Sequence, residues 1–183
     1  MAPAVMLEPH TPFIALGTEI TAMAVDMFLK LDGIKGESHD STHKEEIDVL
    51  AWSWGLSQSG TTHSGGGGGA GKVNVQDISF TKWVDKASPV LFLDCANGKH
   101  IKEATLTNRK AGKDQQEYLV IKLTDLIVSS VQHGDSAGGE DRLTENVTLN
   151  FAQVQVTYTP QKADGGAESP VVNGWDIAKN VKL

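Results

Sequence analysis

Residues 27–60 decide the fold, and they read MFLKLDGIKGESHDSTHKEEIDVLAWSWGLSQSG. The run at their start alternates apolar and polar side chains, which is typical of a half-buried strand. A second run places small side chains on one face of a strand and large apolar ones on the other. The large ones are Leu50, Trp52, Trp54 and Leu56. Two such strands, joined by a long charged connection, predict a sheet with one apolar face.

The connection from Gly36 to Glu46 is the candidate functional site. It is longer than most connections in a compact domain. We expect it to be too polar to bury and to project from the sheet, where a loop on a stiff strand pair can carry function. Its charged and imidazole side chains are Glu37, His39, Asp40, His43, Lys44, Glu45 and Glu46.

Length and composition narrow the class of protein. A chain of 183 residues is long enough for one domain with a real core. Its net charge of -7 argues against nucleic acid or an anionic membrane as the main partner. Cys95 is the only cysteine, so an intrachain disulfide is impossible. No stretch approaches the roughly 18 apolar residues that span a bilayer.

The first 22 residues differ from the rest of the chain. They contain three prolines and no lysine or arginine, whereas a signal peptide needs a basic start and a longer apolar core. We expect residues 1–22 to be a poorly ordered leader or start-site extension, with a single domain over residues 23–183. An ordered arm packed on the sheet is the alternative.

Five glycines at residues 65–69 predict a flexible loop. Residues 66–72 also match the spacing of a phosphate-binding loop. However, Val73 stands where a magnesium-binding hydroxyl is needed, and the segment that follows reads as a strand instead of a helix. The match is therefore not taken as a nucleotide site.

Two long strands change phase midway, which points to a closed sheet. In residues 72–84 and again in residues 142–161 the apolar positions move from one parity to the other. A bulge produces such a change and bends a sheet towards closure. The expected fold is therefore mainly β, a small curved antiparallel barrel, closed by a last strand over residues 175–183.

One short helix is expected over residues 88–96. Ser88 can cap it, Pro89 suits its first turn, and Gly98 supplies a left-handed end. The helix is apolar nearly all round, so it should pack on the barrel or form a subunit contact, with Cys95 inside the core. The residues expected in the core are Trp52, Trp54, Phe80, Leu91 and Phe151.

Four segments, at residues 23–38, 45–60, 65–82 and 138–158, resemble the haemolysin-coregulated protein (Hcp) family of type VI secretion. The resemblance covers residues 23–183. It implies a β-barrel with a flanking helix that assembles as a homohexameric ring. It also implies that rings stack into a tube under a VgrG spike and inside a contractile sheath, with effector toxins in the lumen. Such a protein leaves the bacterial cytoplasm without a cleaved signal peptide, and it is neither an enzyme nor a cofactor binder.

Two other classes of function remain open from the residues alone. His39 and His43, four apart among acids, are the ligand types of a metal-dependent enzyme, but the segment is a poor helix candidate. A monomeric carbohydrate-binding barrel could use Trp52 and Trp54. A ring in solution favours a tube component, and a monomer favours the alternatives. For the tube, we expect reversal of Glu45 and Glu46 to lysine to leave rings intact and abolish stacking.

Overall fold

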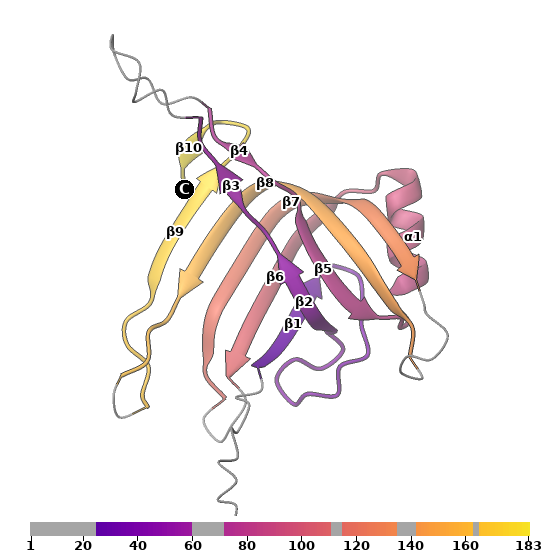
Figure 1. The fold of residues 1–183 in the computed structure, drawn as a ribbon, viewed down its shortest axis with the longest axis horizontal. Helices are drawn as coiled ribbons and strands as arrows, with labels where there is room; N and C mark the ends of the chain where they lie inside the picture. Colours follow the sequence, from indigo (N-terminus) through magenta and orange to yellow (C-terminus); the bar gives the residue numbers. More distant parts are fainter. Residues whose placement is uncertain (1–24, 60–71, 111–114, 135–141, 163–164) are drawn as a thin grey trace, which may run out of the picture.

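The computed structural model describes residues 25–59, 72–110, 115–134, 142–162 and 165–183 (Figure 1). The expected leader, the five glycines and residues 66–71 of the phosphate-loop match lie outside the described residues. The elements are β1 (Val25–Leu31), β2 (Ile47–Ser53), β3 (Leu56–Ser57), β4 (Asn74–Val75), β5 (Ile78–Trp83), α1 (Ser88–Asn97), β6 (Ile101–Lys110), β7 (Glu117–Gly134), β8 (Thr144–Tyr158), β9 (Val171–Asp176) and β10 (Val181–Lys182).

The main sheet closes on itself as an antiparallel barrel. Its strand order is β10-β9-β8-β5-β2-β1-β6-β7, and β7 also pairs with β8 along most of its length. Strands β8, β5, β2, β1, β6 and β7 therefore form a closed ring, and β9 and β10 extend it as a separate edge. The expectation of a small curved antiparallel barrel with one short helix is confirmed. The expectation that residues 175–183 close the barrel is wrong, because β7 and β8 close it.

A bulge in β2 decides which side chains enter the barrel. The register against β5 shifts between Val49 and Ala51. Ile47 and Val49 are buried before the shift, and Trp52 turns inward after it. Leu50 was expected on the face of the two tryptophans, but it lies at the shift and is 38% exposed. One extra residue in the strand accounts for the difference.

The two expected phase changes have different origins. Residues 72–84 form two separate strands, because β4 pairs with β3 while β5 enters the barrel, so this change is a break and not a bulge. In β8 the change occurs within a continuous strand, where Phe151 and then Val154 are buried. At that point β8 exchanges β5 for β9 as its neighbour.

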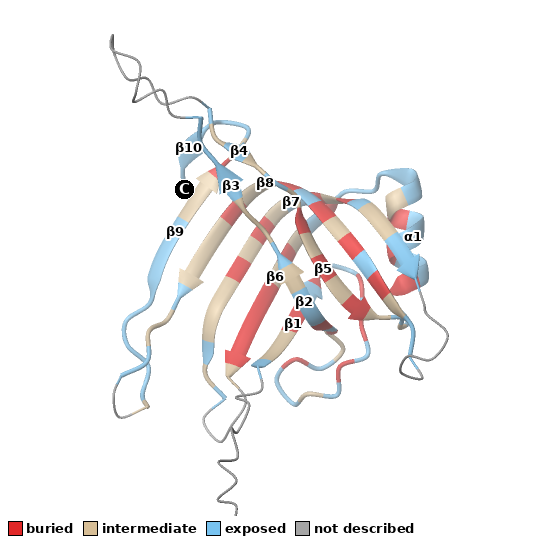
Figure 2. Ribbon diagram, viewed as in Figure 1, coloured by how far each residue is buried: buried red, intermediate tan, exposed pale blue. Residues whose placement is uncertain are grey.

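The core fills the barrel (Figure 2). Phe80, Leu91 and Phe151 are buried as expected, whereas Trp52 and Trp54 are only partly buried and pack against the core. Each tryptophan uses its indole N–H inside the subunit. Trp52 donates to Asn108 Oδ1 at 2.8 Å, and Trp54 donates to the Gln76 carbonyl oxygen at 3.0 Å.

Helix α1 packs against β7 beside the barrel. Its N-cap position is Ala87, which makes no side-chain cap, so the expectation that Ser88 caps the helix is wrong. Ser88 Oγ instead accepts the Asp85 backbone N–H and donates to Glu145. The expected left-handed end is confirmed at Gly98, where φ is 66°. Cys95 is half-buried and packs against the core.

Candidate functional site

The segment from Gly36 to Glu46 is tied down and does not project freely. Its two arms pair through the Gly36 N–H to the Glu45 carbonyl, at 2.8 Å, and the Ser38 N–H to the Glu46 carbonyl, at 3.0 Å. A Cβ on Gly36 would lie 2.3 Å from the Glu46 carbonyl oxygen, so the closely spaced arms require glycine there. Ser38 and His43 are buried. The expectation that this segment is too polar to bury is therefore wrong for Ser38 and His43, whereas Glu37, His39 and Lys44 are exposed as expected.

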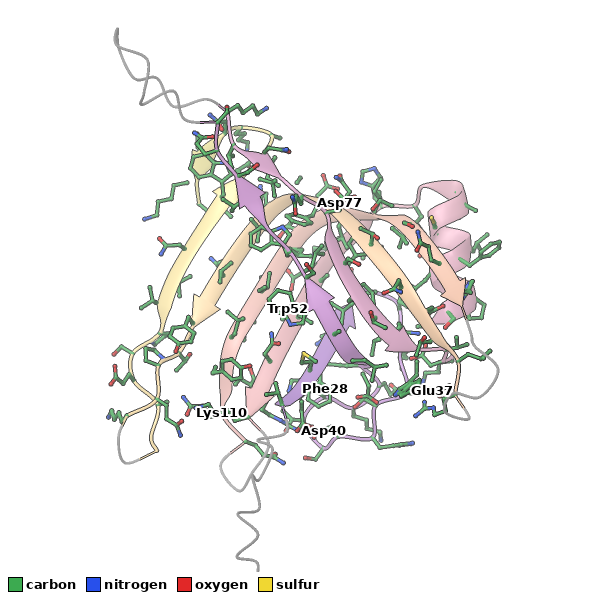
Figure 3. The ribbon with its side chains drawn as sticks, in the orientation of Figure 1. Phe28, Glu37, Asp40, Trp52, Asp77 and Lys110 are labelled. Carbon is green, nitrogen blue, oxygen red and sulfur yellow. The ribbon has the colours of Figure 1, made fainter. Side chains whose placement is uncertain are left out.

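Arg109 of β6 holds the middle of the segment at Asp40, which is labelled in Figure 3. The buried guanidinium of Arg109 binds both carboxylate oxygens of Asp40 and one oxygen of Asp26, at 2.7–3.1 Å. The hydrogen bond from Arg109 keeps the pKa of Asp40 well below its ordinary value. The same bond to Asp40 raises the pKa of Arg109, so the pair stays charged. Bidentate pairing of this kind fixes position as well as charge.

His43 is a structural side chain in this arrangement. Its ring stacks on Phe28 of β1 with 4.3 Å between the centroids. Its Nδ1 lies 2.9 Å from Glu46 and its Nε2 lies 3.4 Å from Glu117. The guanidinium of Arg109 also lies over the Phe28 ring, at 4.9 Å. Stacking on Phe28 thus helps to bury His43, which the sequence suggested would stay exposed.

The remaining charges of the segment lie at the surface, and several are paired. Glu45 contacts Lys35 at 2.7 Å and Lys86 at 3.6 Å. The hydrogen bond from Lys35 is the main cause of the lowered pKa of Glu45. Glu37 accepts the backbone N–H of Lys86 at 3.1 Å. Lys44 is exposed. The acidic surplus of the segment is therefore largely compensated within the subunit.

His39 and His43 have separate surroundings. His39 borders a small hollow with Trp83 and Arg142, whereas His43 is stacked on Phe28. Among the residues that the structure describes, no group of three or more His, Cys, Asp or Glu side chains could hold a metal ion. The described part of the chain also contains no helix long and apolar enough to cross a membrane.

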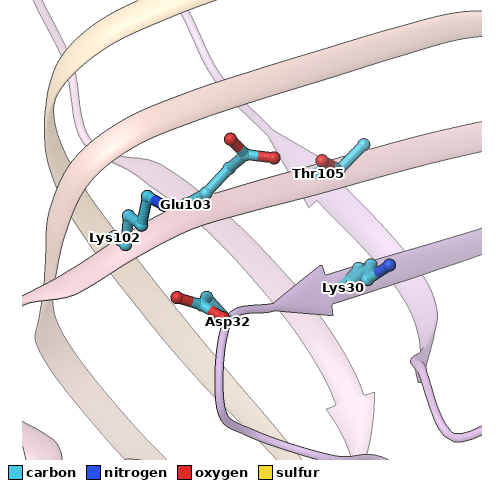
Figure 4. A pocket seen from close by; sticks show the side chains of 5 residues that line it. All are labelled: Lys30, Asp32, Lys102, Glu103 and Thr105. Atoms are coloured by element: carbon cyan, nitrogen blue, oxygen red, sulfur yellow. The ribbon is translucent and has the colours of Figure 1, made fainter.

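A hollow between β1 and β6 is charged but lacks a nucleophile with a base (Figure 4). It has a volume of about 170 Å³. Its lining residues are Lys30, Asp32, Lys102, Glu103 and Thr105. Opposite charges line this shallow surface without histidine, cysteine or serine. The arrangement suits a solvated surface, and it does not form a catalytic constellation.

Sequence reasoning missed a buried ionic cluster that joins α1 to the barrel. Lys82 of β5 is fully buried, and its Nζ lies 2.7 Å from both Asp85 and Glu145 and 3.1 Å from Ser88. His133 of β7 reaches the same Glu145 at 2.9 Å. The sequence did contain a signal that Lys82 points inward, because Lys82 lies on the same face of the strand as the inward-facing Ile78 and Phe80.

Comparisons with known proteins agree with one another. The family model described as "Type VI secretion system effector, Hcp" matches residues 28–158. Protein hcp1 of Pseudomonas aeruginosa is 66% identical over 162 residues, which cover 87% of this chain and 99% of that protein. The crystal structure of Hcp1 from Salmonella typhimurium is 43% identical, with a TM-score of 0.73, and covers 88% of this chain and all of that one. A "type six secretion system protein" of known structure is 33% identical, with a TM-score of 0.84, over 87% of this chain and all of that one.

Proposed function

Because the chain belongs to the Hcp family of type VI secretion proteins, we propose that it is the subunit of the secretion tube. In this proposal six copies close into a ring, and rings stack into a tube. The protein acts by assembly and not by catalysis. The observation that carries the proposal is a pair of apolar surfaces on opposite sides of the barrel, one on α1 and one on β9, that the described residues leave exposed.

A closed ring of more than two copies needs two different contact surfaces on each subunit. Figure 1 places α1 at one end of the longest axis of the molecule and β9 at the other. The exposed apolar side chains there include Phe92 and Leu93 on α1, and Val171 and Val172 on β9. A stable ring contact buries on the order of 1,200–2,000 Å² in total. Sheet edges around these side chains would have to supply the rest.

Native mass spectrometry of the purified chain tests the ring. We expect a hexamer at micromolar concentration. A monomer under the same conditions would contradict the proposal and would favour a monomeric enzyme or carbohydrate-binding barrel. The structure gives little support to a carbohydrate-binding barrel, because Trp52 and Trp54 pack against the core and donate their N–H groups within the subunit.

Stacking would use the two remaining ends of the barrel. The segment 36–46 lies at one end, and β3, β4 and β10 lie at the opposite end (Figures 1 and 3). The first end presents Glu37 and Glu45, while Lys179 precedes β10 and Lys182 lies in it at the other end. Exposed ion pairs each contribute only about 0–1 kcal/mol. Such contacts suit a tube that must be assembled and later taken apart.

The proposed partners follow from the tube. A VgrG spike would cap it, a contractile sheath would surround it, and effector toxins would travel in its lumen. The chain would leave the bacterial cytoplasm through this machine without a cleaved signal peptide. Detection of the intact chain in the medium of a producing strain, and its loss when the sheath is deleted, is the expected result. Export that persists without the sheath would contradict this part of the proposal.

A further inference from the structure

Both ring nitrogens of His43 lie beside a carboxylate. Nδ1 is 2.9 Å from Oε2 of Glu46, and Nε2 is 3.4 Å from Oε1 of Glu117. Glu46 ends the segment 36–46, whereas Glu117 begins β7. The His43 side chain is only 7% exposed, so its nitrogens depend on these carboxylates and not on solvent for partners. His43 therefore lies between two acidic side chains that belong to different elements.

The neutral form of the ring can serve only one of these carboxylates. A neutral imidazole has one N–H donor, an imidazolium has two, and an ionised carboxylate can only accept. Nδ1 has a hydrogen-bond partner in Glu46, but the buried Nε2 has none among the described residues. With a single proton on Nδ1, the ring directs the lone pair of Nε2 towards Glu117. A second proton, on Nε2, turns this repulsion into an ion pair.

The surrounding charges favour the second proton. Arg109 binds Asp26 and Asp40, so its own positive charge is already compensated. Glu46 and Glu117 have no ion-pair partner other than His43 in the described part of the chain. Burial works against a charged ring, whereas two adjacent carboxylates without another cation work for it. The described charged residues on the elements around His43 are Asp26 on β1, Asp40, Lys44 and Glu46 in the segment, Arg109 on β6 and Glu117 on β7.

Stacking fixes the direction of the ring. The rings of His43 and Phe28 are nearly parallel, with 11° between their planes and 4.3 Å between their centroids. The backbone N–H of His43 donates to Oδ1 of Asp40 at 3.1 Å, and Arg109 binds that same oxygen. Figure 3 labels Phe28 and Asp40 at this end of the barrel. The ring is thus held with each nitrogen facing its carboxylate.

We propose that His43 is a pH-dependent bridge, whose protonated ring ties the segment 36–46 to β7 through Glu117 and whose loss of the Nε2 proton breaks that tie. The bond from Nδ1 to Glu46 remains in both forms. Histidine ordinarily changes its charge between about pH 5 and pH 8. A proton that the folded chain binds more tightly than the unfolded chain stabilises the fold at low pH, and this contribution disappears as the pH rises. The bridge lies within one subunit, so it does not depend on the proposed ring.

The nearby pair of Asp40 and Arg109 does not titrate in the same range. The hydrogen bond from Arg109 keeps the pKa of Asp40 well below its ordinary value, and the same bond raises the pKa of Arg109. Both side chains stay charged between about pH 5.5 and pH 8.5. A change in the contribution of Glu117 over this range therefore does not come from that pair.

Glu117→Gln removes the second carboxylate and tests the bridge, with Glu103→Gln as its matched control. The two glutamates are similarly exposed, at 43% and 40%, but Glu103 pairs with Lys122 and not with a histidine. Glu117→Gln should raise the unfolding equilibrium constant about 2- to 5-fold at about pH 5.5 and less than about 1.5-fold at about pH 8.5. Glu103→Gln should have the same effect at both pH values. Urea unfolding measures all of these constants.

A second background and a direct measurement identify the titrating group. In His43→Gln, the effect of Glu117→Gln should be small and equal at both pH values. Nitrogen NMR of histidine-labelled wild type should show protons on both nitrogens of His43 at about pH 7, where the exposed His39 is mostly neutral. The His43 signal is the one that moves most in Glu117→Gln. The wild type and Glu117→Gln therefore keep the test decisive if His43→Gln does not fold.

Three results would overturn the proposal. An equal effect of Glu117→Gln at both pH values would mean that this contact does not depend on a proton. A pH-dependent effect that persists in His43→Gln would assign the titration to another group. A His43 ring with one protonated nitrogen at about pH 7 would show a neutral structural histidine.

Discussion

Arg109 binds Asp40 with both ends of its guanidinium, at 3.1 Å to Oδ1 and 2.7 Å to Oδ2, and so ties the 36–46 segment to β6. The pair joins residues far apart in the sequence and is largely buried on the arginine side. It explains how a segment rich in charge is held against the end of the barrel.

The first prediction concerns this pair. Asp40→Asn should lower the free energy of unfolding by about 1.5–3 kcal/mol, the contribution of hydrogen bonds to a charged group. The pKa of Asp40 is lower in the folded chain than in the unfolded chain. Its contribution is therefore complete above the unfolded pKa of about 3.9 and is lost as the pH falls towards the folded value.

Thermal unfolding between pH 7 and pH 3 measures this effect. The wild-type melting temperature should fall below about pH 4 more steeply than that of Asp40→Asn. Asp32→Asn, at an exposed position that follows β1, is the control and should retain the wild-type profile. Parallel profiles for the wild type and Asp40→Asn would contradict the assignment.

The second prediction concerns the buried cluster around Lys82. Lys82→Met should destabilise the chain by about 3–5 kcal/mol, because the buried Glu145 loses the ammonium partner that lies 2.7 Å from it. Adding Glu145→Gln should recover part of the loss. Urea unfolding measures both. Lys122→Met removes the exposed pair with Glu103 and should change stability by less than about 1 kcal/mol. A cost for Lys82→Met as small as that of this control would mean that the cluster is not coupled to folding.

The third prediction concerns stacking. Glu46 is mostly buried beside His43, so reversing it would disturb the subunit. Glu45 is 43% exposed and is the cleaner test. Glu45→Lys should leave rings intact and weaken ring-to-ring association and secretion, because it places a third cation beside Lys35 and Lys86.

Electron microscopy and sizing of Glu45→Lys decide this point. Glu103→Lys, on the barrel wall, is the control and should stack normally. Monomers of the Glu45 variant would mean that the segment is a contact within the ring. Unchanged tubes would place stacking on a different surface.

The fourth prediction concerns the bond between Trp52 and Asn108. Trp52→Phe should cost about 1–3 kcal/mol, because Asn108 is buried and its Oδ1 loses its donor. Trp54→Phe should cost less, since its acceptor is a backbone oxygen near the surface. Denaturant midpoints of the two variants give the comparison, and equal midpoints would contradict it.

The fifth prediction is the absence of a bound metal. Chain purified without a histidine tag should contain no stoichiometric zinc by elemental analysis. One tightly held zinc per chain would overturn this prediction and would bring His39 and His43 back as ligands. Loss of that zinc on changing His39 alone would identify the exposed histidine as the ligand.

The phase changes in the sequence were sufficient to predict a closed barrel, but not to place its strands. A change of parity signals that a strand bends or ends, and both occur: β8 continues through its change, whereas residues 72–84 split into two strands. The same pattern cannot tell a bulge from a break, because the partner strands decide it. The face of Leu50 was therefore predicted wrongly, since it depends on a register shift against β5.

The candidate segment was located by its composition, but its conformation was not predictable from local sequence. Arg109 lies in a strand that reads as polar and solvated, and its partner Asp40 is distant in the chain. A buried ion pair depends on two elements arriving at the same place, which no local pattern records. Lys82 could have been assigned to the interior, since it follows the inward parity of β5.

The long pairing of β7 with β8 has a consequence for synthesis of the chain. These two strands are neighbours in sequence and form the most extensive pairing among the described strands, so they can pair early. Strands β1 and β2 leave the ribosome first, but they share only a short pairing with each other. Their main partners, such as Ala104 for Leu31, arrive much later. The amino-terminal strands must therefore wait with apolar side chains uncovered, and the barrel is completed only when translation is nearly finished.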